Sequence, residues 1–99
     1  PFMIEVSASW KDREVSILTR SGEKAWFKQR GAGKTGVAIE LTPSLWPSGD
    51  RIELAYQLKD PTLNLTLDSS ATIKPGRQLT ISDHGEEIRL GARVVPLEE

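Results

Sequence analysis

Three short segments of this chain contain residue types that take part in catalysis or ligand binding. The first, Gly31-Ala32-Gly33-Lys34-Thr35, has the composition of the end of a phosphate-binding loop. Such a loop also needs a glycine five residues before the Gly-Lys-Thr, where this chain has Lys28, and a helix beginning at the lysine, whose amides hold the phosphate. The residues that follow alternate like a strand instead. We therefore expect a glycine-rich connection here rather than a nucleotide site.

The second segment, Leu67-Asp68-Ser69-Ser70-Ala71, resembles the active-site turn of retroviral-type aspartic proteases, in which Asp-Thr/Ser-Gly-Ala presents a catalytic carboxylate. Ser70 stands where that motif has its glycine. The glycine permits the tight turn that brings the carboxylate to its partner. We therefore interpret Asp68-Ser69-Ser70 as a plain turn between two strands.

The third segment surrounds His84, the only histidine, which is preceded by Asp83 and followed by Gly85, Glu86 and Glu87. One imidazole with several carboxylates could hold a divalent ion weakly, but the spacing does not make these side chains converge. A Ser-His-Asp triad stays open, although no Gly-x-Ser-x-Gly elbow is present. Asp-His-Gly suits a hairpin tip because glycine readily adopts positive φ. We expect a turn, and we assign no catalytic residue, no cofactor-binding residue, no cofactor and no metal ligand.

Length and composition indicate one small domain, residues 1–99, that folds around one core without covalent cross-links. The absence of cysteine excludes disulfides, thiolate catalysis and cysteine metal sites. No apolar run reaches the ~18–20 residues of a membrane-spanning helix, and no basic-then-apolar signal segment opens the chain. Because the chain begins at Pro1 rather than at Met, we expect a mature form or an excised domain.

Charge is nearly balanced overall, with a formal net charge of −1, but it is divided unevenly along the chain. The segment from Lys11 to Thr35 holds seven basic and three acidic residues, whereas the remainder holds six basic and eleven acidic residues. A dedicated nucleic-acid binder usually has a pI above about 9, so we expect no nucleic-acid partner. The division suits head-to-tail self-association or an anionic partner, with two solvated faces as the alternative.

Apolar and polar residues alternate with period 2 through most of the chain. The clearest example joins 37–41 to 52–58 across Pro43, Pro47, Ser48, Gly49 and Asp50, and it predicts an antiparallel hairpin with one face on a core. We expect further strands over 2–10, 15–19, 25–27, 63–67, 71–73, 79–81 and 88–92. Short strands separated by regular turn signals predict an all-β fold, a single antiparallel β-sandwich or barrel-like domain of about 8–9 short strands.

Three tryptophans are a high number for this length, and exposed tryptophan can anchor a protein interface or stack on a sugar ring. Trp10 continues the apolar face of the first strand, so we expect it in the core. Trp26 alternates with Phe27, so one of the two faces outwards. Trp46 lies in a turn and is the best candidate for an exposed anchor. The candidate partner-binding residues are Lys28, Arg30, Lys34 and Trp46.

Several of these segments together resemble the C-terminal β-domain of bacterial secretins, a family of type II and type III secretion and pilus systems. That domain carries an Asn/Ser-Gly-x-x-Ala element, a glycine-led strand ending in Thr-Pro-x-Leu, a Gly-Asp/Asn turn with its return strand, and a later Gly-Gln-Thr-Leu-x-Leu strand. The corresponding segments here are Ser21–Ala25, Gly36–Leu45, Ser48–Leu54 and Pro75–Ile81. The resemblance covers roughly residues 15–82 and implies a secretin-like β-module in the periplasm or cell envelope.

Two departures separate this chain from a complete secretin domain. Secretins end with Val-Pro-x-Leu and then Leu-Gly-x-Leu-Phe, whereas here Val95-Pro96-Leu97 is followed only by two glutamates. The segment 59–70 is also too short and too polar to supply both a gate and a membrane-crossing hairpin. The resemblance therefore implies an isolated or degenerate module, with no membrane-spanning segment in this chain.

Three functions follow as hypotheses. The first is a non-enzymatic structural or assembly module of a bacterial envelope or secretion-type apparatus, which acts by self-association or by binding a protein partner through edge strands and complementary charge. The second is a ligand- or carbohydrate-binding β-sandwich that uses Trp46 and Tyr56. The third is a small hydrolase or nucleotide-binding enzyme.

Overall fold

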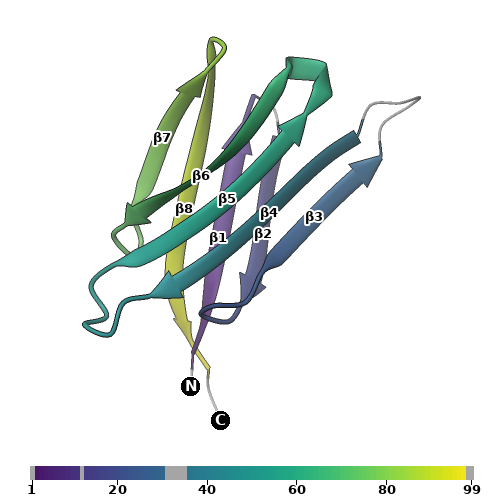
Figure 1. Cartoon of the computed structure of the whole chain (residues 1–99). Helices are drawn as coiled ribbons and strands as arrows, with labels where there is room; N and C mark the ends of the chain where they lie inside the picture. Colours follow the sequence, from purple (N-terminus) through teal and green to yellow (C-terminus); the bar gives the residue numbers. More distant parts are fainter. Residues whose placement is uncertain (1, 12, 31–35, 98–99) are drawn as a thin grey trace.

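The chain folds into a β-sandwich of two antiparallel sheets, seen in a computed structural model that describes residues 2–11, 13–30 and 36–97, except the side chains of 29 and 30 (Figure 1). One sheet has the strand order β2-β1-β8-β7 and the other the order β3-β4-β5-β6. The described strands are β1 (Phe2–Trp10), β2 (Arg13–Thr19), β3 (Ala25–Arg30), β4 (Gly36–Leu45), β5 (Ile52–Asp60), β6 (Leu65–Ile73), β7 (Gln78–Asp83) and β8 (Glu86–Pro96). The prediction of an all-β sandwich is confirmed.

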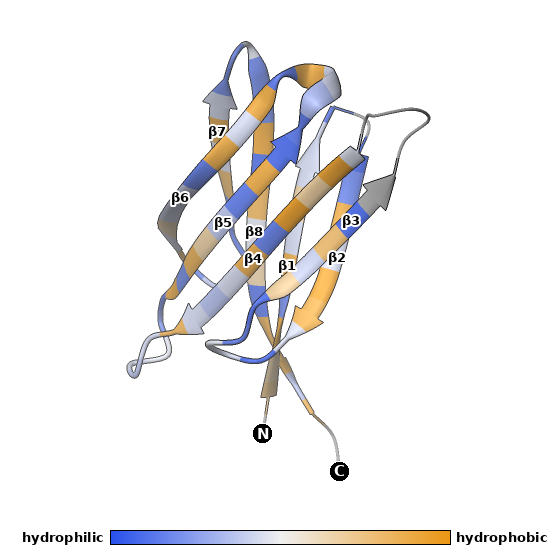
Figure 2. Ribbon diagram, turned by 45° about the vertical axis from the view of Figure 1, so that its right-hand side comes forward, coloured by the Kyte–Doolittle hydropathy of each residue, from blue (hydrophilic) through white to orange (hydrophobic). Residues whose placement is uncertain are grey.

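Alternation places one face of each sheet against the other. Along β5, every second residue from Ile52 to Asp60 is buried and the residues between are exposed. Figure 2 shows the apolar residues recurring at alternate positions along β4 and β5. These two strands form the predicted hairpin, with Leu41 opposite Tyr56 and Ile39 opposite Leu58. The inward residues of both sheets meet in one core, and Trp10 belongs to it with 2% of its surface exposed.

The turn of this hairpin begins later than the sequence suggested. Pro43, predicted as a turn former, lies inside β4 opposite Leu54. The Pro43 carbonyl accepts a hydrogen bond from the Gly22 amide at 2.7 Å, on the side of β4 where β3 has already ended. A proline lacks an N–H and is tolerated in a strand where no ladder bond needs that donor. The strand therefore continues to Leu45.

The polar segment Asp68-Ser69-Ser70 is not a turn, so that prediction is wrong. It lies within β6, which pairs with β5 without interruption from Ile52 opposite Ile73 to Asp60 opposite Leu65. The polar residues fit this strand because β6 is the outermost strand of its sheet and its outward face meets solvent. The break occurs earlier, because Pro61–Leu63 forms a short 3-10 helix, η1, rather than the start of the strand.

The last hairpin matches its prediction at the turn and exceeds it in length. Asp83 lies opposite Glu86, so His84 and Gly85 form a two-residue loop with φ of +50° and +79°. Positive φ at both central residues is the geometry of a type I′ turn. The strand that follows, β8, runs beyond Ala92 to Pro96, because β1 pairs with it as far as Phe2, which lies opposite Pro96. The second strand also begins earlier than the expected range 15–19, because Arg13 is the first residue of β2.

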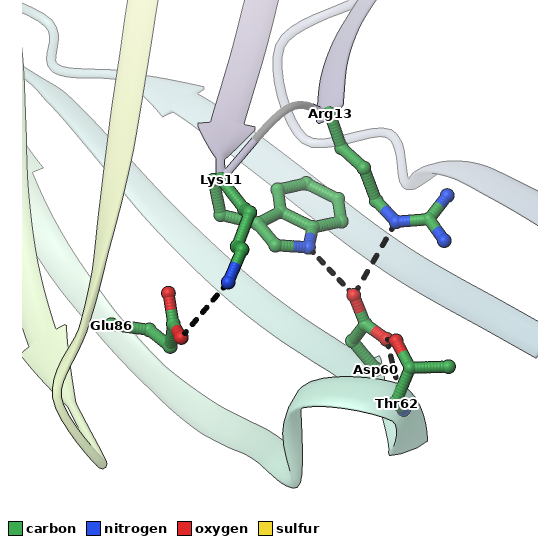
Figure 3. A network of polar contacts seen from close by, with 6 residues as sticks. Lys11, Arg13, Asp60, Thr62 and Glu86 are labelled. Atoms are coloured by element: carbon green, nitrogen blue, oxygen red, sulfur yellow. Dashed lines mark hydrogen bonds and ion pairs between the residues drawn. The ribbon is translucent and has the colours of Figure 1, made fainter.

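One buried carboxylate joins the two sheets. Asp60 at the end of β5 is fully buried, and its Oδ2 atom accepts a hydrogen bond from the indole Nε1 of Trp10 at 2.9 Å and lies 3.5 Å from the Nε of Arg13. Its Oδ1 atom accepts hydrogen bonds from the backbone N and the Oγ1 of Thr62, at 3.2 and 2.6 Å. Figure 3 shows the carboxylate between the first hairpin and the beginning of η1. We call Trp10, Arg13, Asp60 and Thr62 the Asp60 clamp.

The clamp keeps its carboxylate charged. Burial by itself would raise the pKa of Asp60, but the hydrogen bonds from Thr62 and Trp10 and the positive charge of Arg13 outweigh burial and lower this pKa below its ordinary value. The same carboxylate caps η1 through the Thr62 amide. Asp60 therefore contributes both to sheet docking and to the turn that leads into β6.

Replacing Asp60 by alanine is expected to lower the free energy of unfolding by about 2–4 kcal/mol, because the buried indole N–H and the Arg13 guanidinium lose their acceptor. Urea unfolding followed by circular dichroism measures the change. The variant Glu5→Ala is the control, because it removes a carboxylate from the exposed pair with Arg93, and we expect a far smaller loss. Equal losses in the two variants would contradict the clamp.

Acid should weaken the clamp in a defined direction. Because the folded-state pKa of Asp60 lies below its unfolded value, its stabilisation is complete above about pH 5 and is lost as the pH falls through the folded-state pKa. We expect the difference in unfolding free energy between the wild type and Asp60→Asn to shrink between about pH 5 and about pH 2. Urea titrations across this range measure it, and a difference that does not change with pH would exclude the mechanism.

Candidate interaction surface

The uneven charge of the sequence becomes an uneven charge of the two lateral edges of the sandwich. β2 and β3 are the outermost strands at one side of the two sheets, and they lie beside each other in Figure 1. Both strands come from the basic segment 11–35. β6 and β7 are the outermost strands at the opposite side. We call β2, β3 and the turn between them the basic edge, and the strands β6 and β7 the cation-free edge.

Side chains on the basic edge are partly engaged within the molecule. Lys24 lies 3.6 Å from a carboxylate oxygen of Glu40, and Arg13 belongs to the Asp60 clamp. The Nζ of Lys28 lies 5.7 Å from the centre of the Trp26 ring, within the range of a cation–π contact. These contacts hold the cations close to the strands, so their charge stays at the edge.

The opposite edge differs in composition. Neither β6 nor β7 contains lysine or arginine, and their acidic residues are Asp68 and Asp83. Lys74 and Arg77 lie in the connection between the two strands, and on the neighbouring strands Lys59 lies opposite Thr66 and Arg89 opposite Thr80. The side chain of Asp68 is exposed on the outward face of its sheet. A negative group thus stands in the middle of one edge strand and a positive group, Lys28, in the middle of another.

The four candidate residues from the sequence do not form one site. Lys28 is exposed on β3, and Arg30 ends the same strand, opposite Gly36, with its side chain outside the described part. Lys34 lies outside the described residues. Trp46 is 42% exposed in the turn between β4 and β5, where its amide donates to the carbonyl of Arg51. Trp46 lies eight positions beyond Ala38, the partner of Lys28, and this spacing corresponds to about 25 Å along an extended strand.

Trp26 is the more exposed tryptophan, with 65% of its surface accessible. Its neighbours Ala25 and Phe27 face the core, so the predicted division of this strand into two faces is confirmed, with the indole outwards. The strand register places Trp26 of β3 opposite Glu40 of β4. Glu40 in turn lies opposite Gln57 of β5, and Gln57 lies opposite Asp68 of β6. These side chains form one row across the outer face of the sheet. A shallow hollow on this face is lined by residues that include Glu40, Gln57 and Asp68.

Tyr56 cannot serve as the exposed aromatic platform that the carbohydrate hypothesis assigned to it. Its side chain belongs to the core, and only 8% of the residue surface is exposed. The reason is its position in β5, where it occupies the same inward alternation as Leu54 and Leu58. Of the two aromatics proposed for sugar binding, only Trp46 is available.

His84 occupies the exposed tip of the last hairpin, where its Nδ1 lies 2.9 Å from an oxygen of Asp83. Within the described ranges, no group of three or more histidine, cysteine, aspartate and glutamate side chains is placed to hold a metal ion. No helix among the described residues is long and apolar enough to cross a membrane. Comparisons with protein-family models, with curated proteins and with solved structures give no match for this chain.

Two residues of this surface are not among the candidates that the sequence predicts. The alternation of Trp26 with Phe27 indicates only that one of the two faces outwards. Asp68 was assigned to a turn, because three consecutive polar residues resemble a turn when the pairing partner is unknown. Its place in an edge strand follows from the regular pairing of β6 with β5.

Proposed function

We propose that this chain is a non-enzymatic assembly module that joins copies of itself, or a protein partner, through the lateral edges of the sandwich. The observation that carries the proposal is the location of the basic segment. Its strands β2 and β3 form one lateral edge, while the strands of the opposite edge contain no cation. A basic edge on one side, and on the other side strands whose only charged residues are acidic, favour head-to-tail contact over face-to-face contact.

Edge strands supply the second part of the interaction. The outermost strand of a sheet has a row of backbone N–H and C=O groups that no neighbouring strand pairs. Addition of a strand from another chain satisfies these groups, and charged side chains beside the strand select the partner. Contact between unlike edges of two copies is heterologous, so it closes a ring or propagates.

The location of such an assembly is part of the proposal. The segments that resemble the secretin β-domain include the β4–β5 hairpin and the residues leading into β7. This resemblance supports a role in a bacterial envelope or secretion-type apparatus, in the periplasm or at the cell envelope. The charge division supports the assembly itself without reference to the family.

Self-association should depend on salt. We expect light scattering at low ionic strength to show oligomers at high protein concentration, and we expect the mean mass to fall by at least half at about 1 M salt, where the Debye length is near 3 Å. The cause is screening of the attraction between unlike edges. A monomer at high concentration and low salt would contradict self-association.

A second candidate function, saccharide binding, is favoured by the row on the outer face of the second sheet. Trp26 supplies an exposed indole that can stack on a sugar ring, and the carboxylates and amide of Glu40, Gln57 and Asp68 accept or donate hydrogen bonds to hydroxyls. This location replaces the one predicted from Tyr56. Trp46 is not part of this row, because it lies in the β4–β5 turn, about 25 Å from Lys28 on β3.

Tryptophan fluorescence separates the two functions. If a saccharide binds to the row, titration with neutral oligosaccharides should shift the emission, and Trp26→Ala should abolish the shift while Trp46→Ala leaves it intact. A pure assembly module should show no response to any oligosaccharide. A response that survives Trp26→Ala would exclude the row as the site.

A further inference from the structure

We infer that β3 of one copy adds to β6 of the next copy as the fifth strand of its sheet, with Lys28 opposite Asp68. This inference rests on the proposed assembly function and specifies the two strands and the register. Both strands belong to the sheet β3-β4-β5-β6, and both are outermost in it. Pairing would therefore extend one sheet from copy to copy.

β6 has the properties of an acceptor strand. It is nine residues long, and its register with β5 is continuous, so no bulge bends the outer edge away. It contains no proline and no lysine, the residues with which edge strands usually resist pairing. Its only charged residue is Asp68. β7, the other strand of the cation-free edge, offers only six residues.

β3 has the properties of the donor strand. It carries Lys28 and Arg30 and no acidic residue, whereas β2 carries Glu14 beside Arg13, and Arg13 is engaged with Asp60. The four strands of the sheet alternate in direction, so the two outer strands run opposite ways. A copy displaced sideways without rotation thus presents β3 antiparallel to β6, the pairing found in the rest of the sheet.

Pairing of Lys28 with Asp68 and the match of side-chain sizes favour one register. Asp68 is the only charge on β6, so a single antiparallel register sets Lys28 directly opposite it. In that register Trp26 lies opposite Ser70 on the outer face. On the inner face Ala25 lies opposite Ala71 and Phe27 opposite Ser69. Large and small side chains therefore meet on both faces.

The inner face supplies an independent reason for this register. Ser69 has the inward alternation of Leu67 and Ala71, yet it is exposed, so the inner face of β6 is accessible to solvent at this point, beside the partly buried Leu67 and Ala71. Phe27 is only partly buried in its own copy. Placing Phe27 of the next copy against Ser69 covers apolar surface of both copies, which favours association.

Disulfide trapping tests the register, because the chain has no cysteine of its own. Trp26→Cys in one preparation and Ser70→Cys in another are mixed at low salt and oxidised. Positions 26 and 70 lie on opposite edges of one copy, at least about 14 Å apart, so no bond forms within a copy. We expect a cross-linked dimer in the mixture at several times the yield of either variant alone. Trp46→Cys mixed with Ser70→Cys is the matched control.

Charge reversal tests the pair itself. We expect Lys28→Glu and Asp68→Lys each to weaken association about tenfold, and the double variant to recover to within about threefold of the wild type. Gln57→Lys is the control, because it adds a positive charge to the same face on a central strand. Combining it with Lys28→Glu should not restore the association that Lys28→Glu weakens. Circular dichroism confirms that each variant is folded.

The outcomes separate the inference from the proposed function. Oligomers that form without the 26–70 cross-link, or without rescue in the double variant, overturn the β3–β6 pairing and leave assembly standing. A wild-type protein that stays monomeric at low salt, together with no cross-link in the mixture of the two cysteine variants, overturns both the pairing and the proposed self-association. Cross-linking with rescue supports both.

Discussion

Docking of the two sheets beside the β1–β2 and β5–η1 connections depends on the carboxylate of Asp60. The strands β1 and β2 lie in one sheet and β5 in the other, so side chains rather than backbone ladders must hold these elements together. Trp10 and Arg13 reach the carboxylate from the first sheet, while Thr62 reaches it from the turn after β5. A buried charge with fewer partners would be costly. The three partner residues, which make four contacts with the carboxylate, make the arrangement specific.

The clamp also lies at the connections that lead to two of the edge strands, β2 and β6. It sits where β1 turns into β2 and where β5 turns into η1 and then β6. Each of these connections leads from an inner strand to an outer one. Backbone pairing with β1 and β5 makes β2 and β6 the outer strands, and the clamp fixes their two connections relative to each other. The separation of the basic edge from the cation-free edge is therefore a consequence of the fold and of the order of charges along the chain.

The alternation of apolar residues predicted the strands well where a strand is half-buried, as in β1, β4 and β5. It failed at β6 and at Pro43, because both depend on a neighbour that is distant in sequence. Three polar residues in a row remain a strand when β5 supplies their partners, and a proline remains in a strand when β3 has ended beside it. The Asp60 clamp was not predictable for the same reason, since Trp10 and Asp60 are fifty residues apart.

Edge chemistry connects these observations to the proposed function. A sandwich with free edges normally protects them with lysine, proline, bulges or short strands. Here β3 has its lysine, whereas β6 is long and regular and has one aspartate as its only charge. A lysine on one edge and an aspartate on the other disfavour pairing of like edges, because like charges would meet, and they favour pairing of unlike edges. The residue set that limits indiscriminate aggregation is thus the same set that would direct copies into a head-to-tail order.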